Sequence, residues 1–573
     1  MSRLVYISTN YRYNKENPTN FGGDDMEYAT ERRLEDIAPL LERLDRGETL
    51  SEEEHAELAA IRRLDGIGWE GELPHSIRTL TALESLNLRD SQVSNLTPLS
   101  GLLALKSLDL ESTHVSDLTP LSGLTALRSL DLMSAQVSDL TPLSGLTALE
   151  YLNLWNTQVS NLTPLSGLTA LESLNLRYTQ VSNLTPLSGM MTLKSLNLGG
   201  TQVSKLTPLS GLKNLEFLNL DNIQVNDLTP LSGMTALKSL NLFTDQLSNL
   251  SLLCGLRNLE SLGLSHTQVS DLSPLSGLRT LKRLRLANTK ARDLAALSGL
   301  EQLEYLDLRY CNLRAIPRYL IERFDKIYWD MNYHDKGIFL DGATISTQPI
   351  SIFRESDEVI RAYYDAPKKA VRESKVIFLG DGGAGKTHTI KRILKDGKDD
   401  NIGTDATLGI AIQPYTAHKG RPDEFKINFW DFGGQENMHA MHRCFLTERT
   451  LYVVVINNRW DLDQQARYWL DNIHSFAPDS PVILAVNLWE GIHKYGLDTN
   501  RLHRDYPNLV EVQPYAAKGE DNGNFTALTN LIVEQAEKLD SCAMELPVEW
   551  AAIRQEMIDK ANSDEWYLNR VLR

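Results

Sequence analysis

Cysteine is scarce in this chain, with 4 among 573 residues. The four, Cys254, Cys311, Cys444 and Cys542, lie far apart, and no pair has the close spacing of a metal-binding motif. This scarcity excludes a disulfide framework and a cysteine zinc site, and it favours a reducing compartment.

Long apolar runs and an excess of basic residues are also missing. No stretch approaches the roughly 18 apolar residues of a membrane-spanning helix, and the first apolar run is too short for a secretory leader. Lysine and arginine number 58 against 75 aspartate and glutamate, a formal net charge of −17 that argues against nucleic-acid binding. No kinase, protease or nuclease motif is present. We expect a cytoplasmic protein without a transmembrane segment.

Residues 1–73 are predicted to form a helical cap on the segment that begins at residue 74. Helices are expected over about 27–44 and again after Ser51, where Ser51 and Glu54 make a capping box. Leu58, Ile61 and Leu64 extend the helical spacing of the second one. An open stack of repeats needs such a cap with a polar outer face.

Residues 74–335 are dominated by a repeat of 22 residues. One leucine column contains Leu96, Leu118, Leu140, Leu162, Leu184, Leu206, Leu228, Leu250, Leu272 and Leu294. The Leu-x-x-Leu-x-Leu core recurs eleven times and is the leucine-rich-repeat signature. The Asn or Cys usual in that pattern is mostly Thr here, as at Thr113, Thr157 and Thr179, whose hydroxyl can bond the turn backbone. The sequence therefore predicts a solenoid with a parallel sheet on its concave face.

Aromatic side chains are expected among the polar residues of that concave face. Trp155, Tyr178 and Phe243 occupy outward-facing positions beside a column of Asn and Asp. Aromatic anchors rimmed by polar groups favour a protein-binding surface, while scattered surface aromatics without a role are the alternative. His114 and His266 are interpreted as isolated surface residues.

After the repeats, residues 336–373 are predicted to be a C-terminal cap and linker. Ile338–Leu340 is expected to be a last strand, 351–364 a connecting helix, and 367–369 a hinge. From 374 to 545 strands and helices alternate, as in a mostly parallel α/β sheet. The expected strands are 375–379, 426–430, 451–456, 482–486 and 510–514, and the expected helices include 389–394, 464–476 and 525–539.

The stretch from Gly380 to Thr387 fits G-x-x-x-x-G-K-[ST], the phosphate-binding P-loop. A strand precedes it and a helix follows, so backbone amides and the helix N-terminus point together at a polyphosphate. Lys386 is assigned to the β- and γ-phosphates and Thr387 to Mg²⁺. The predicted nucleotide-binding residues of this segment are Gly380, Asp381, Gly382, Gly383, Ala384, Gly385, Lys386, Thr387 and His388.

A second signal follows the strand 426–430, where the sequence reads Asp-Phe-Gly-Gly-Gln-Glu from Asp431. It resembles the switch II element of Ras-like GTPases, in which Asp431 would hold Mg²⁺, the Gly434 amide would sense the γ-phosphate and Gln435 would position water. For switch I we choose Thr407 as a further Mg²⁺ ligand, with Thr404 as the alternative.

The base-recognition end departs from the usual N-K-x-D of related GTPases. Asn487 is followed by Leu488, and Glu490 takes the place of the aspartate. Ala517 and Lys518 resemble the element that contacts the guanine O6. A carboxylate can accept from guanine N1–H and N2–H₂ but not from the corresponding edge of adenine. Guanine is therefore favoured, with loose binding and fast exchange expected.

Leucine-rich repeats followed by these motifs resemble the Roco family, in which a Roc GTPase domain is followed by a COR domain. The resemblance implies an α/β fold, a repeat solenoid joined to a Ras-like P-loop domain. It also implies GTP or GDP with Mg²⁺, slow hydrolysis with Gln435 and Lys386 as catalytic residues, and a molecular switch. Residues 546–573 resemble only the start of COR, so a homodimer is expected only if a complete COR domain is present. A partner could supply an arginine finger; Arg443 and Arg449 lie just past switch II.

Two other functions stay open. One is a scaffold that binds nucleotide without hydrolysing it, which the unusual segment 487–490 keeps in play. The other is an ATP-driven sensor, against which the Asp431–Glu436 segment speaks.

Overall fold

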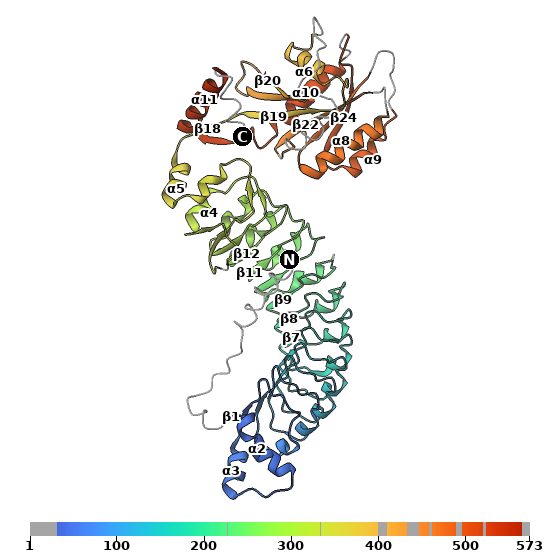
Figure 1. Cartoon of the computed structure of the whole chain (residues 1–573), viewed down its shortest axis with the longest axis vertical. Helices are drawn as coiled ribbons and strands as arrows, with labels where there is room; N and C mark the ends of the chain where they lie inside the picture. Colours follow the sequence, from blue (N-terminus) through green and yellow to red (C-terminus); the bar gives the residue numbers. More distant parts are fainter. Residues whose placement is uncertain are drawn as a thin grey trace. The chain divides into compact units, whose positions relative to one another are not determined.

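The computed structural model describes residues 31–225, 227–332, 334–398, 410–432, 446–447, 449–457, 461–488, 496–519 and 523–563. The chain divides into two compact units, Met1–Leu313 with Pro317–Thr344, and Arg314–Ile316 with Ile345–Arg573 (Figure 1). The domain boundaries proposed from the sequence stay predictions.

The N-terminal unit is built on one parallel sheet of 15 strands. Its strands in spatial order are β1 (Glu31–Arg33), β2 (Arg63–Asp65), β3 (Ser85–Asn87), β4 (Ser107–Asp109), β5 (Ser129–Asp131), β6 (Tyr151–Asn153), β7 (Ser173–Asn175), β8 (Ser195–Asn197), β9 (Phe217–Asn219), β10 (Ser239–Asn241), β11 (Ser261–Gly263), β12 (Arg283–Arg285), β13 (Tyr305–Asp307), β16 (Gly337–Phe339) and β15 (Ile327–Tyr328). The eleven predicted repeat strands and the last strand near 338–340 are confirmed as β3–β13 and β16.

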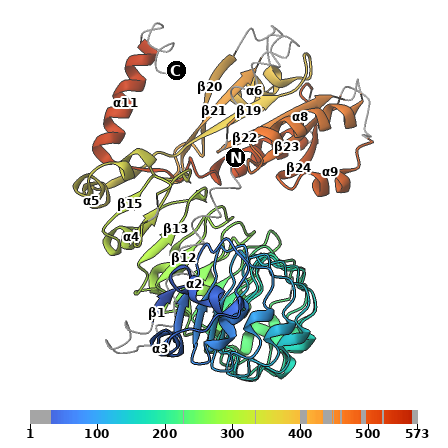
Figure 2. The ribbon, with the colours of Figure 1, turned by 60° about the horizontal axis from the view of Figure 1, so that its bottom comes forward.

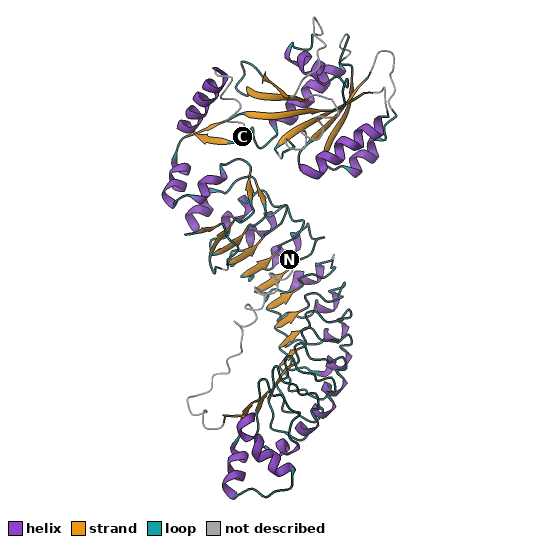
Figure 3. Cartoon of the chain, in the orientation of Figure 1, coloured by secondary structure: helices purple, strands orange, loops and turns teal. Residues whose placement is uncertain are grey.

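Short 3-10 helices lie on the side of the repeats opposite to the strands (Figure 3). They are η3 (His75–Thr79), η4 (Thr97–Leu99), η5 (Thr119–Leu121), η6 (Thr141–Leu143), η7 (Thr163–Gly167), η8 (Thr185–Leu187), η9 (Thr207–Leu209), η10 (Thr229–Gly233), η11 (Ser251–Gly255), η12 (Ser273–Gly277) and η13 (Ala295–Gly299). The leucine column between the two sides is buried in every repeat, so each repeat completes its core only against its neighbours.

Polar side chains of the repeat satisfy the backbone where the chain turns. At the strand end, Asn153 Oδ1 accepts from the Trp155 amide at 3.1 Å. The buried Thr179 Oγ1 donates to the Leu176 carbonyl at 2.7 Å. The predicted role of threonine in place of Asn or Cys is therefore confirmed. The Asn side chains on the concave face therefore have a structural role, because their oxygens accept hydrogen bonds from backbone amides just after each strand.

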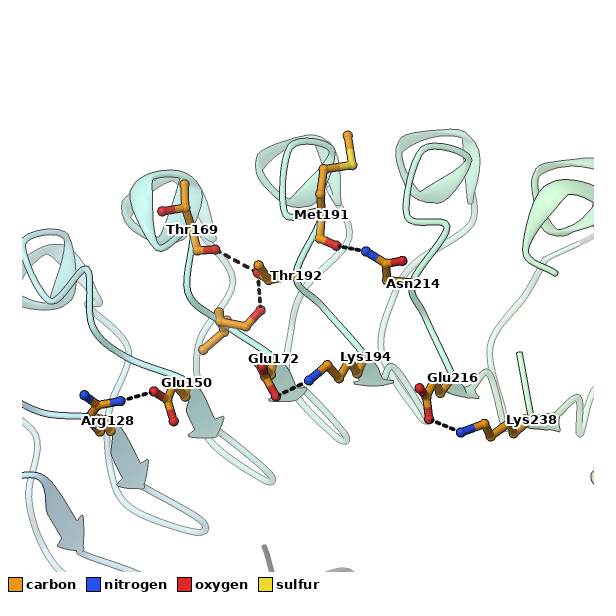
Figure 4. A network of polar contacts seen from close by, with 11 residues as sticks. Arg128, Glu150, Thr169, Glu172, Met191, Thr192, Lys194, Asn214, Glu216 and Lys238 are labelled. Carbon is orange, nitrogen blue, oxygen red and sulfur yellow. Dashed lines mark hydrogen bonds and ion pairs between the residues drawn. The ribbon is translucent and has the colours of Figure 1, made fainter. Parts of the chain in front are cut away.

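Neighbouring repeats are also joined by polar contacts along one flank (Figure 4). Lys194 Nζ lies 2.8 Å from Glu172 Oε2, and Lys238 Nζ lies 2.7 Å from Glu216 Oε2. Thr192 Oγ1 donates to the Thr169 carbonyl at 2.8 Å. Each contact links residues about one repeat apart and so supports the regular stacking.

The N-terminal cap agrees in part with its prediction. Helices α2 (Leu34–Asp45) and α3 (Glu52–Ala60) are present, and the Ser51–Glu54 capping box is confirmed. Two details are wrong: residues 31–33 form strand β1, and Leu64 lies in β2 instead of extending a helix. Strands β1 and β2 pair with each other and extend the repeat sheet. The backbone hydrogen bonds of this sheet outweigh the local preference for a helix that the spacing of apolar residues suggests.

The segment between the repeats and the second sheet holds several short elements. They are β14 (Asn312–Leu313), α4 (Arg318–Arg323), β17 (Thr344–Ile345), η14 (Ile350–Arg354), α5 (Asp357–Asp365) and β18 (Lys368–Ala370). The connecting helix predicted over 351–364 is split into η14 and α5. The hinge predicted at 367–369 is wrong, because β18 pairs antiparallel with β25 (Glu545–Pro547), which precedes α11 (Val548–Ser563).

The second unit carries a six-stranded sheet in the order β20-β21-β19-β22-β23-β24. The strands are β19 (Glu373–Leu379), β20 (Ile410–Ala417), β21 (Phe425–Phe432), β22 (Thr450–Asn457), β23 (Val482–Asn487) and β24 (Leu509–Tyr515). Only β20 is antiparallel to its neighbour. Helices α6 (Lys386–Leu394) and α10 (Asn524–Glu537) share a core with one face of the sheet, while α8 (Leu462–Phe476) and α9 (Thr499–Asp505) pack on the other (Figure 2). All predicted strands of this region are confirmed, whereas β20 and α9 were missed.

Among the described residues, no helix is long and apolar enough to cross a membrane. Cys254, Cys311 and Cys542 are free thiols, as the sequence analysis expects, and Cys444 lies outside the described part.

Candidate functional site

The P-loop leaves the sheet at the carboxyl end of β19, where the strand order reverses between β21 and β22. Ligands of open α/β sheets bind at this kind of position. Gly380 has a φ of +141°, and a Cβ there would lie 2.1 Å from the Val455 carbonyl oxygen of β22. Only glycine lets the loop start so close to the neighbouring strand.

The loop then turns into the N-terminus of α6. Gly385 has a φ of +109°, and a Cβ at this position would lie 2.5 Å from Asn487 Nδ2. The helix begins at the next residue, Lys386. Gly382 and Gly383 are exposed, and a Cβ on Gly383 would meet nothing within 4 Å. Gly380 and Gly385 thus allow the loop to lie close to the neighbouring strands, while the space around Gly383 is open.

Lys386 is only 5% exposed and points back into the loop. Its Nζ donates to the carbonyl oxygens of Gly380 at 2.7 Å and Asp381 at 3.0 Å. Burial lowers the pKa of Lys386 to about 8, although Asp431 and Asp381 act in the opposite direction. A phosphate group in the loop would give this ammonium the negative partner that favours its charged form.

Thr387 and Asp431, predicted to bind one metal ion, are brought together by the fold. Thr387 Oγ1 donates to Asp431 Oδ2 at 2.6 Å, and Asp431 is fully buried at the end of β21. A hydroxyl and a carboxylate are oxygen ligands of the kind that Mg²⁺ prefers, so this pair fits the ion.

Asn487, at the end of β23, connects the P-loop with the loop after β24. Its Nδ2 donates to the Ala384 carbonyl at 2.9 Å, and its Oδ1 accepts from the Ala517 amide at 3.0 Å. Ala517 is buried and Lys518 is exposed beside it. The predicted base-recognition residues Asn487, Ala517 and Lys518 therefore lie next to the P-loop. His388 is half-buried one residue after Thr387.

Two contacts of the P-loop were missed by sequence reasoning. Trp469 of α8 donates from Nε1 to Asp381 Oδ1 at 3.3 Å. Asn457, at the end of β22, donates from Nδ2 to the Gly383 carbonyl at 3.4 Å. Neither residue belongs to a motif, so no sequence signal could have placed them there.

Several predicted residues lie outside the described part of the chain. They are Thr404, Thr407, Gly434, Gln435, Arg443 and Glu490. Arg449 is described, and its guanidinium donates to the Ile345 carbonyl.

Comparison with protein families matches both parts of the chain. Residues 375–490 match the family described as "Ras of Complex, Roc, domain of DAPkinase". Residues 147–189, 192–233 and 257–299 match the family of leucine-rich repeats in two copies.

Two curated relatives show similarity over part of their length. A Roc-COR-CHAT protease of Runella zeae is 25% identical over 222 residues, which are 35% of this chain and 24% of that protein. The probable serine/threonine-protein kinase roco5 of Dictyostelium discoideum is 32% identical over 151 residues, which are 24% of this chain and 5% of that protein. The chain therefore spans about a quarter or less of either relative.

Among solved structures, the Roco2 RocCORdC protein of Methanosarcina barkeri bound to GDP is similar. It is 36% identical, with a TM-score of 0.30, and the match covers 34% of this chain and 58% of that one.

Proposed function

We propose that this chain, a Roco protein in which leucine-rich repeats precede a Roc domain, is a Mg²⁺-dependent GTP-binding switch that hydrolyses GTP slowly in the cytoplasm. The repeats supply a protein-interaction surface. The parts are proposed to be residues 1–73 (cap), 74–335 (repeats), 336–373 (linker), 374–545 (Roc domain) and 546–573 (start of a COR-like segment).

The observation that carries the proposal is the bond between Thr387 and Asp431 beside the buried Lys386. It joins the two motifs that a phosphate-bound metal ion requires, although they are far apart in sequence. Thr387 and Asp431 would hold Mg²⁺ at this place, and the ion would supply positive charge against the phosphate groups. The α6 N-terminus and the loop amides bind the phosphates, and Lys386 adds the positive charge.

Guanine is the proposed base. Asn487 fixes the segment before Glu490 to the P-loop, and it also fixes the loop with Ala517 and Lys518. A guanine ring is proposed to lie against that loop, with Glu490 accepting from its N1 and N2 groups.

Slow turnover is proposed because a partner is expected to supply part of the catalytic machinery. Gln435 is expected to orient the attacking water, but an arginine that neutralises the transition state typically increases the hydrolysis rate by a further factor of about 10³–10⁵. Arg449, which sequence reasoning considered, is hydrogen-bonded to the Ile345 carbonyl. The arginine is therefore proposed to come from a partner.

The proposed partner surface is the concave face of the repeats. Tyr178 is 39% exposed there, whereas Trp155 and Phe243 are half-buried. Phe243 packs on His266, with ring centroids 4.5 Å apart, so the interpretation of His266 as an isolated residue is wrong. Rigid aromatic groups among polar ones suit the centre of a protein interface.

Replacing Lys386 tests nucleotide binding. We expect Lys386→Ala to weaken Mg²⁺·GTP binding by at least about 100-fold, since it removes a charge-assisted contact worth roughly 1.5–3 kcal/mol and leaves carbonyls unpaired. Fluorescent GTP and GDP titrations measure this, with ATP as competitor. Lys419→Ala, at an exposed position between β20 and β21, is a control for nonspecific charge loss. Tight binding retained by Lys386→Ala, or ATP displacing GTP, would contradict the proposal.

Hydrolysis is tested separately in single-turnover reactions with an excess of protein. Gln435→Leu is expected to slow GTP cleavage at least tenfold while GTP affinity stays unchanged. Equal rates in the two proteins, both at the uncatalysed level, would favour the scaffold that binds without hydrolysing.

A further inference from the structure

Arg392 of α6 is a buried cation that the motifs of the Roc domain do not account for. It is 1% exposed, on the inner face of the helix between the apolar Ile390 and Ile393. An arginine in such a place must satisfy its donors within the protein, because a buried guanidinium without partners is costly.

All hydrogen bonds recorded for its side chain go to main-chain carbonyls of the described residues. Nη1 donates to Ala516 and to Ala517, each at 3.1 Å, and Nε donates to Gly397 at 2.8 Å. The guanidinium carbon lies 4.2 Å from the ring centroid of Phe525 in α10. The side chain therefore joins α6 to the loop after β24 and stacks on a third element.

The loop that Arg392 holds is the one assigned to base recognition. The carbonyls of Ala516 and Ala517 are held by Arg392, while the Ala517 amide is held by Asn487. A loop held at both its carbonyls and its amide has little freedom to move. A displacement of about 1 Å is enough to weaken hydrogen bonding strongly, so the anchor matters for recognition.

We propose that Arg392 is a positioning residue for guanine recognition: it anchors the Ala516–Lys518 loop on the phosphate-binding helix, so that this loop discriminates the 6-oxo group of the base. The inference rests on the proposed function. It assigns selectivity to a residue that does not touch the nucleotide and belongs to no nucleotide-binding motif. The same guanidinium holds Gly397, shortly before the segment that carries Thr404 and Thr407.

The test compares GTP with 2-aminopurine riboside triphosphate, which lacks the 6-oxo group, in binding titrations on the full chain. Wild type is expected to prefer GTP. Arg392→Met is expected to lower that preference at least tenfold, the loss of roughly one hydrogen bond. Affinity for inorganic tripolyphosphate with Mg²⁺, which has no base, is expected to stay within twofold. Arg392→Lys keeps the charge but lacks the planar guanidinium that reaches three carbonyls and stacks on Phe525. Its preference for GTP should lie between those of wild type and Arg392→Met.

The matched control is Tyr515→Phe. Tyr515 Oη lies 2.7 Å from Thr389 Oγ1, so this change removes a buried polar contact between α6 and the end of β24, just before the loop, and spares the loop carbonyls. Its preference for GTP should remain that of wild type. Equal weakening of GTP and the analogue by Arg392→Met, or the same loss of preference in Tyr515→Phe, would overturn the inference.

Failure of wild type to bind either nucleotide would instead overturn the proposed function, and the inference with it. If both Arg392 variants unfold, Phe525→Leu replaces them, because it removes the ring on which the guanidinium stacks and so loosens its hold on the loop carbonyls. That variant must show a reduced preference for GTP, and an unchanged preference in it sinks the inference.

Discussion

The concave face of the repeats shows how one atom can change a residue's energetic role. Most repeats carry Asn at the last strand position, and β4 and β5 carry Asp109 and Asp131 there. Both types accept from the amide two residues later, as Asp131 Oδ1 does from Met133 at 2.9 Å. The carboxylate adds a charge that the turn does not need. Burial, with Asp109 as a further cause, raises the pKa of Asp131 to about 6.

We therefore expect Asp131→Asn to stabilise the protein at pH 7.5 by on the order of 1 kcal/mol, because it removes a buried charge and keeps the Oδ1 acceptor. This gain is expected to outweigh the loss of the hydrogen bond that Asp131 Oδ2 accepts from Asn153 Nδ2. A pKa that is higher in the folded than in the unfolded state means that wild type gains stability as the pH falls from about 6 toward 4. The advantage of the variant should disappear over that range. Urea unfolding at pH 7.5 and pH 4.5 measures it.

The control for this prediction is Asp139→Asn. Asp139 is fully exposed and accepts from the Thr141 amide at 2.9 Å. The Asp139→Asn change should not stabilise the protein at either pH. A destabilised Asp131→Asn protein at pH 7.5 would show that the charge has a stabilising partner.

At the scale of the repeat element, one kind of contact stabilises the turn within each repeat and another joins neighbouring repeats. The threonine hydroxyls are buried and bond to carbonyls of their own repeat, at 2.8 Å for Thr113 and 2.7 Å for Thr157 and Thr179. The lysine–glutamate pairs are about half exposed, as for Lys194 with 52% and Glu172 with 48%. Buried hydrogen bonds are worth about 1 kcal/mol each, whereas exposed ion pairs contribute roughly 0–1 kcal/mol.

Two triple variants separate these contributions. Thr113, Thr157 and Thr179 changed together to Val should cost roughly 3 kcal/mol, since the sites are far enough apart to add. Lys194, Lys238 and Lys282 changed together to Ala should cost less than about 1 kcal/mol, and less still in high salt. Chemical denaturation of both proteins gives the comparison. A larger loss of unfolding free energy in the lysine triple variant would mean that the lysine–glutamate pairs, two of which Figure 4 shows, set the stability of the repeats.

At the scale of the whole molecule, the chain consists of two compact units with separate cores. A ligand that binds only the folded Roc domain should stabilise that unit and leave the repeats unchanged. With GDP at about 100 times its Kd, the gain is roughly 2.7 kcal/mol, which raises the Tm of a unit of this size by about 5–10 °C.

Differential scanning calorimetry with and without GDP and Mg²⁺ tests this expectation. The wild-type protein should show two unfolding transitions, and GDP should raise the Tm of one of them. In Lys386→Ala, GDP should raise neither Tm. A single transition that shifts as a whole would show that the units unfold together.

Much of the structure could be predicted from the local sequence. The 22-residue leucine period predicts the repeat strands because each strand is specified within its own repeat. The P-loop was equally visible, since its glycines and Lys386 act within eight consecutive residues. Strand β20 was missed because it is an edge strand with a mixed, partly exposed pattern that includes Pro414. Strand β18 was predicted to be a hinge because its partner β25 (Glu545–Pro547) lies far away along the chain.

The amino-acid order alone was thus enough to specify the repeat solenoid, the phosphate-binding loop and the choice of Thr387 and Asp431 as partners. The folded arrangement was needed to find that Trp469 and Asn457 contact the P-loop and that Arg392 anchors the loop at 516–517. The reason is physical: repeats and loops are encoded by neighbours along the chain and leave a periodic or motif signal. Contacts between distant strands and helices depend on how the sheet is ordered, and a single residue far from any motif carries no trace of that order.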